Sequence, residues 1–138
     1  METVLQSLSG VMSFSIYFAV AIFMLLLFKW VYTLITPHDE WQLVKEEQSS
    51  AAAIGFIGAI LGFSLALASA ASNSVSLIDF AIWGVVALIA QSIAFLIVRF
   101  IFMPKVVERI KNNEVSAGIM LGGTAVAVGL LNAACMTY

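Results

Sequence analysis

The stretch GAILGFSLALASA, residues 58–70, decides how this chain is built. Small side chains recur in it at every fourth position, so they share one face of a helix: Gly58, Gly62, Ala66 and Ala70. The same spacing returns 67 residues later, at Ala125, Gly129, Ala133 and Thr137. Small residues along one face let two backbones approach closely, which favours helix association in lipid. The stretch predicts a helix–helix contact, with a narrow pore or a lipid groove lined by these faces as the alternative.

The composition around this stretch is that of a membrane protein. Of 138 residues, 62 % are hydrophobic and 10 % are charged, and the mean hydropathy is +1.07. Apolar runs long enough to cross about 30 Å of hydrocarbon indicate four transmembrane helices, at about 11–35, 50–71, 79–103 and 115–138. We therefore predict an all-α membrane protein with a single membrane domain spanning residues 1–138, in which the lipid bilayer is the main partner.

The basic residues predict the orientation in the membrane. All six Lys and Arg residues lie in or beside two connectors, 36–50 and 104–114, whereas the 72–79 connector and both ends of the chain have none. Because cationic residues are retained on the cytoplasmic side, both connectors are predicted to be cytoplasmic and both termini periplasmic. No basic patch with interleaved aromatic residues points to nucleic acid. The single cysteine, Cys135, excludes an internal disulfide and multi-cysteine metal sites.

The two halves of the chain align without gaps at the offset of 67 residues. Pro37 falls on Pro104, Glu47 on Glu114, and Gly62 on Gly129. We interpret this as an internal repeat, with one unit at about 11–71 and the other at about 78–138. Because each unit contains two helices, the two units are predicted to have the same orientation in the membrane.

The first connector, TPHDEWQLVKEE at 36–47, contains the only histidine. His38, Asp39 and Glu40 are consecutive, so on a helix they point about 100° apart and do not converge on one metal ion. The aligned positions in the second unit are Lys105, Val106 and Val107, which cannot repeat such a site. We interpret the segment as a solvated or interfacial connector. Its functional alternative is a surface for docking a partner, formed by His38, Asp39, Glu40 and Trp41.

Four polar residues are candidates for a pathway through the membrane. Glu47 and Glu114 occur in both units and could form a carboxylate pair at the cytoplasmic entrance, or simply favour the starts of the following helices. Gln91 and Asn132 lie within predicted spans, where amides mark either hydrogen bonds between helices or a polar path.

The segments ITPHDEWQLVK, AIWGVVALIAQ and GLLNAACMTY together resemble the YjfL-like bacterial inner-membrane proteins, a family of unknown function. The resemblance covers nearly the whole chain. It implies a two-helix domain that often occurs in two copies, residence in the bacterial inner membrane, and a role in the cell envelope. It implies no catalytic or binding residues.

No hydrolase, phosphate-loop or zinc-protease motif occurs in the sequence. We therefore predict a protein that is not an enzyme and has no cofactor or metal. The leading hypothesis is an envelope scaffold or interaction protein that forms homo-oligomers and meets a cytoplasmic envelope-stress partner through its connectors. The alternative is a small oligomeric channel or transporter for ions or cationic small molecules.

Overall fold

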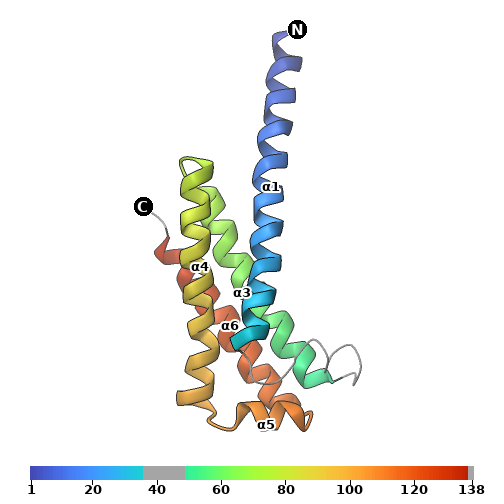
Figure 1. Ribbon diagram of the computed structural model, residues 1–138, viewed down its shortest axis with the longest axis vertical. Helices are drawn as coiled ribbons and strands as arrows, with labels where there is room; N and C mark the ends of the chain where they lie inside the picture. The colour runs from blue at the N-terminus through green and yellow to red at the C-terminus, as the bar shows by residue number, and fades with distance from the viewer. Residues whose placement is uncertain (36–48, 137–138) are drawn as a thin grey trace.

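The computed structural model describes residues 1–35 and 49–136, and every regular element among them is helical (Figure 1). In chain order these are α1 (Glu2–Ile35), α3 (Ser50–Asn73), α4 (Leu77–Ile97), the π-helical turn η1 (Val98–Phe102), α5 (Val106–Lys111) and α6 (Val115–Cys135). Four helices are long and apolar enough to cross a membrane, if η1 is counted as the end of α4. The predicted all-α class with four spans is therefore confirmed.

Helices α3 and α6 form the closest pair, and they run parallel. A Cβ atom on Gly58 would overlap the backbone of Gly122, and one on Gly129 would overlap the backbone of Gly62. Further toward the α3 N-terminus, Gly118 meets the backbone of Ala51 in the same way. The residue numbers of the contacting positions increase in the same direction along both helices, so the two helices are parallel. Glycine is required here because the two backbones touch without side chains between them.

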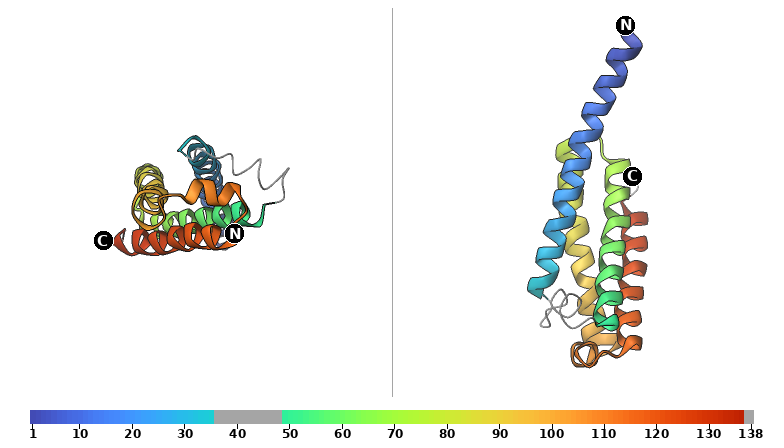
Figure 2. Two further views of the ribbon diagram at one scale, coloured as in Figure 1. Left: turned by 90° about the horizontal axis from the view of Figure 1, so that it is seen from below. Right: turned by 90° about the vertical axis from the view of Figure 1, so that its right-hand side faces the viewer.

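Helices α1 and α4 lie together on one side of the α3–α6 pair, so that the bundle has two layers (Figure 2). The other side of the pair has no helix over it among the described residues. In the most apolar 18-residue stretch of α3, 56 % of the residues are buried inside the bundle. In the corresponding stretch of α6, only 28 % are buried. The structure therefore places α3 at the centre of the bundle and α6 at one edge. The spacing of small residues predicts the face along which α6 packs. It does not predict how many other helices cover the rest of α6.

Helix α1 packs through a single stripe of side chains, Met24, Phe28 and Tyr32, which are spaced four residues apart. The ring of Phe28 stacks on that of Phe63, with centroids 4.6 Å apart. The ring of Tyr32 meets Phe95 edge-on at 6.0 Å. Residues 1–16 are all exposed, and this part of α1 extends beyond the ends of α3 and α4 (Figure 1). The helix thus begins about nine residues before the predicted span.

The connector between η1 and α6 contains a short helix, α5, where the sequence predicts only a connector. Helix α5 runs across the end of the bundle, with Val106 and Ile110 buried against it (Figure 1). Next in the chain, Asn113 adopts φ 58°, and its Oδ1 accepts hydrogen bonds from the Ala51 amide at 3.0 Å and from Ser49 Oγ at 3.2 Å. A side chain from the second connector therefore caps the first turn of α3.

Candidate functional site

The most deeply buried polar side chain of the spans is Gln91, near the middle of α4. It is 2 % exposed, and its Nε2 donates a hydrogen bond to the Ala125 carbonyl of α6 at 2.6 Å. Gly62 of α3 makes room for it, because a Cβ at that position would overlap the Gln91 amide. The amide thus lies where three helices meet. Its Oε1 is buried and accepts no hydrogen bond within the described part of the chain.

Two further polar side chains join helices nearer the end of the bundle that lies opposite α5. Asn132 Nδ2 donates to the Ala87 carbonyl at 3.4 Å and so joins α6 to α4. Ser69 Oγ donates to the Ala133 carbonyl at 2.7 Å and so joins α3 to α6. Ser69 was not among the predicted residues. Its place in the sequence next to Ala70, at the edge of the small-residue face, could have indicated a contact with the neighbouring helix. Gln91, Asn132 and Ser69 therefore all donate to backbone carbonyls of a neighbouring helix.

Glu114 lies outside the hydrophobic spans, at the start of α6. It is the N-cap residue of that helix without a capping side-chain hydrogen bond. Its carboxylate instead forms an ion pair with Arg109, in which both side chains are about two-fifths exposed. Its proposed counterpart, Glu47, lies outside the described residues, as do His38, Asp39, Glu40 and Trp41. The structure therefore neither brings the two carboxylates together nor separates them.

The six predicted packing residues lie on or beside the α3–α6 contact. Gly58, Gly62 and Gly129 make the backbone approaches given above. Ala66 and Ala125 are buried, and Ala133 is half-buried and accepts the hydrogen bond from Ser69.

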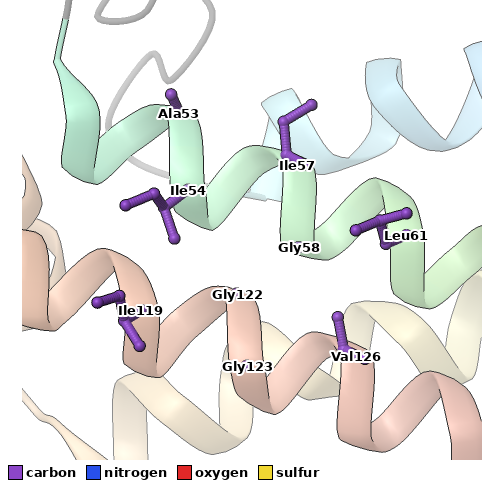
Figure 3. A pocket seen from close by; sticks show the side chains of 9 residues that line it. All are labelled: Ala53, Ile54, Ile57, Gly58, Leu61, Ile119, Gly122, Gly123 and Val126. Atoms are coloured by element: carbon purple, nitrogen blue, oxygen red, sulfur yellow. The ribbon is translucent and has the colours of Figure 1, made fainter.

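On the uncovered side of this contact lies an open groove of about 460 Å³ (Figure 3). Isoleucine, leucine, valine, alanine and glycine form its walls, and Gly58 and Gly122 lie at its floor: Ala53, Ile54, Ile57, Gly58, Leu61, Ile119, Gly122, Gly123 and Val126. No side chain in this lining carries a polar atom. The groove therefore fits hydrocarbon and offers nothing to coordinate an ion.

Within residues 1–35 and 49–136, no three His, Cys, Asp or Glu side chains lie close enough together to hold a metal ion. Gln91, Asn132 and Ser69 donate to carbonyls of adjacent helices, whereas Thr33 and Ser92 donate to carbonyls of their own helices. Six charged residues, Arg99, Lys105, Glu108, Arg109, Lys111 and Glu114, belong to η1, α5 and the residues beside them. This arrangement joins helices and presents a charged surface at one end.

Comparison with known proteins assigns the chain to a family. A model of the family described as Domain of Unknown Function (DUF350) matches residues 6–136. The chain belongs to the DUF350 family. The UPF0719 inner membrane protein YjfL of Escherichia coli strain K12 is 43 % identical over 131 residues, which cover 95 % of this chain and 98 % of that relative. The protein of the same name from Escherichia coli O157:H7 matches to the same extent. No solved structure matches.

Membership of the DUF350 family confirms the resemblance found in the sequence. The relatives' name and the four apolar helices together support residence in the inner membrane. The internal repeat, the homo-oligomer and the placing of both termini in the periplasm stay predictions.

Proposed function

We propose that this DUF350 protein is a non-enzymatic scaffold of the bacterial envelope. It spans the inner membrane and docks a cytoplasmic partner through the connectors 36–50 and 104–114. The observation that carries the proposal is that polar side chains within the spans form hydrogen bonds between helices. Gln91, Asn132 and Ser69 each donate to a carbonyl of an adjacent helix. A transport pathway needs polar groups that face a route, whereas these groups fasten one helix to another.

The packing of the described bundle supports the same function. Between α1, α3 and α4 lie stacked and edge-on aromatic rings, which fill space that a pathway would need. Between α3 and α6 the backbones touch at their glycines, so that contact has no lumen. A closed bundle of this kind suits a protein whose work is done at its surface.

The surface proposed for docking includes the outer side of α5. Glu108 and Lys111 are exposed there, with their charges in water at the end of the bundle. Charged groups of both signs on a rigid helix give a partner electrostatic specificity. The described part of this surface is small, and we propose that 36–50 completes it. The proposed homo-oligomer would multiply the surface by placing several copies side by side.

Flux through proteoliposomes tests this function against the alternative of a channel or transporter. We expect full-length protein in liposomes to release K⁺ and spermidine no faster than protein-free liposomes do. Flux that disappears in the Glu47→Ala/Glu114→Ala double variant would contradict the scaffold and establish the channel. Glu108→Ala is the matched control, because it removes an exposed carboxylate of the same end outside the proposed pathway.

Photocrosslinking in cells tests the docking surface itself. A photoreactive amino acid at position 108 or 111 should give one discrete product with a cytoplasmic protein, identifiable by mass spectrometry. The Glu108→Lys/Lys111→Glu charge swap, with the probe at 112, should abolish that product. The same probe at position 75, in the opposite connector, should not yield it. Equal crosslinking from positions 75 and 111 would contradict a docking surface at α5.

A further inference from the structure

The α5 end of the bundle carries most of the positive charge of the chain. Four of the six Lys and Arg residues fall within positions 99–111: Arg99, Lys105, Arg109 and Lys111. Two carboxylates, Glu108 and Glu114, belong to the same connector. The connector is therefore net positive, and the arrangement of these charges around α5 decides what they attract.

A cleft of about 360 Å³ opens between η1 and α5. It combines an apolar wall with a cationic one, and its lining is Phe102, Met103, Pro104, Lys105 and Arg109. The phenylalanine and methionine belong to the end of the third span, and the two cations belong to the start of the connector. The cleft thus spans the change from hydrocarbon-facing to water-facing residues.

The helical phase of α5 separates its charges into two groups. Successive residues are rotated by about 100°, so Lys105 and Arg109, four apart, project from the same flank. Val106 and Ile110 are buried against the bundle. Lys111 falls on the opposite flank, away from the cleft. Only Lys105 and Arg109 among the described cations therefore line this cavity.

The Arg109 side chain is held in place by its ion pair. Its Nε donates to the Glu114 carboxylate, which leaves the donors of the two terminal nitrogens of the guanidinium for another acceptor. Lys105 is exposed, and no carboxylate of the described residues lies within ion-pair distance of its ammonium. Glu114 weakens the attraction of Arg109 for an anion, but Lys105 keeps the cleft net positive.

The neighbouring η1 residues show the depth at which the cleft lies. Phe100, Ile101 and Phe102 are 66 %, 70 % and 57 % exposed, as expected of side chains that face lipid at the end of a span. Met103 and Pro104 follow them immediately, and then Lys105. The cationic wall therefore stands at the boundary where phospholipid headgroups meet the acyl chains, and the apolar wall faces the chains themselves.

We propose that this cleft binds an anionic phospholipid. Its headgroup phosphate would lie between Lys105 and Arg109, and one acyl chain would run along Phe102 and Met103. A soluble anion would use only the cationic wall. A zwitterionic lipid would use the apolar wall but would gain less from the cationic one, because its own headgroup cation opposes Lys105 and Arg109. An anionic amphiphile satisfies both, and basic residues near a membrane surface select anionic lipids. The site goes beyond docking of a protein partner, which uses the outer face of α5.

Native mass spectrometry of the full-length protein in detergent tests the site. Phosphatidylglycerol and phosphatidylcholine with identical acyl chains are titrated separately, and the bound fractions are compared. We expect phosphatidylglycerol to bind roughly tenfold more tightly, since each basic residue at a membrane surface contributes about fivefold and Glu114 offsets part of this. The Lys105→Ala/Arg109→Ala double variant should lose that preference, whereas Lys111→Ala should keep it.

Further variants separate the charge from the fold. The Lys105→Arg/Arg109→Lys exchange should retain the preference, and Glu114→Gln should increase it by removing the competing carboxylate. Unchanged preference in the double alanine variant would overturn the proposal. So would an equal loss in Lys111→Ala, which would indicate diffuse surface charge. Displacement of phosphatidylglycerol by millimolar glycerol 3-phosphate would also overturn it, because the site would then bind a free anion and not a lipid.

Discussion

Gly129 and Gly123 belong to the same helix but lie in opposite surroundings. A Cβ on Gly129 would overlap the backbone of Gly62, whereas a Cβ on Gly123 would have no atom within 4 Å. The contact of Gly129 is with backbone, which cannot move aside as the end of a flexible side chain can. The pair therefore isolates the close approach of α3 and α6 from the general effect of a methyl group on a helix.

We predict that Gly129→Ala lowers the free energy of unfolding by about 1–3 kcal/mol, because the added methyl group forces the helices apart. Gly123→Ala should be neutral or stabilising by up to about 1 kcal/mol, since alanine is the better helix former. Unfolding by SDS titration in mixed micelles measures both values. Equal effects of the two substitutions would contradict the backbone contact.

At the residue scale, the sequence was informative about where polar side chains lie but not about what they meet. The spacing of four predicted a packing face that includes Gly58, Gly62 and Gly129. Gln91 was recognisable as a polar residue within a span, but its partner, the Ala125 carbonyl, lies 34 positions away. Every residue has a backbone carbonyl, so the sequence does not indicate which one accepts a hydrogen bond, and such partners are found only in the structure. His38, Asp39, Glu40, Trp41 and Glu47 lie outside the described residues.

At the scale of the elements, the four apolar runs were predictable because crossing a bilayer requires length and hydrophobicity. The short helix α5 was not, since VVERIK is too short for its period to stand out, and it is held by tertiary contacts of Val106 and Ile110. The aromatic contacts between α1 and α3 were not predictable either. The stripe of Met24, Phe28 and Tyr32 is regular, but many rings in the other helices could have met it.

The link between connector and helix made by Asn113 belongs to this scale. Its Oδ1 caps α3 from a residue 62 positions away along the chain, and its φ of 58° is unfavourable for most side chains. Capping and conformation can be separated, because glycine adopts this φ freely but has no side chain to cap with.

We predict that Asn113→Gly lowers the free energy of unfolding by about 1 kcal/mol through loss of the cap. Asn113→Ala should cost about 1 kcal/mol more, because it also places a Cβ in the left-handed region. Asn112→Ala is the control, since that residue has φ −85°. SDS titration gives all three values. A wild-type value for Asn113→Gly would show that the cap contributes nothing.

At the scale of the whole molecule, orientation in the membrane is open to a direct test. Cys135 is exposed at the end of α6, toward the end of the bundle opposite α5 (Figure 1). If the termini are periplasmic, a membrane-impermeant maleimide should label Cys135 on intact spheroplasts. In a Cys135→Ser background, Glu108→Cys should be labelled only after permeabilisation. The reverse pattern would invert the predicted topology.

The proposed function requires a closed bundle that docks partners and does not conduct. Ala125 and Gly123 test it well, because they are two residues apart on α6 and face different places. Ala125 is buried beside Gln91, where a route through one chain would pass. Gly123 lines the outer groove, where a pore between copies would form.

The most direct measurement is the rate at which a charged methanethiosulfonate reagent modifies single cysteines in membranes, with Cys135→Ser as the background. We predict modification of Glu108→Cys and none of Ala125→Cys or Gly123→Cys when the reagent is present on both sides, because one thiol is packed in protein and the other faces lipid. Modification of either at a rate within about tenfold of Glu108→Cys, roughly 1.4 kcal/mol in the barrier, would reveal a water-filled route and contradict the scaffold.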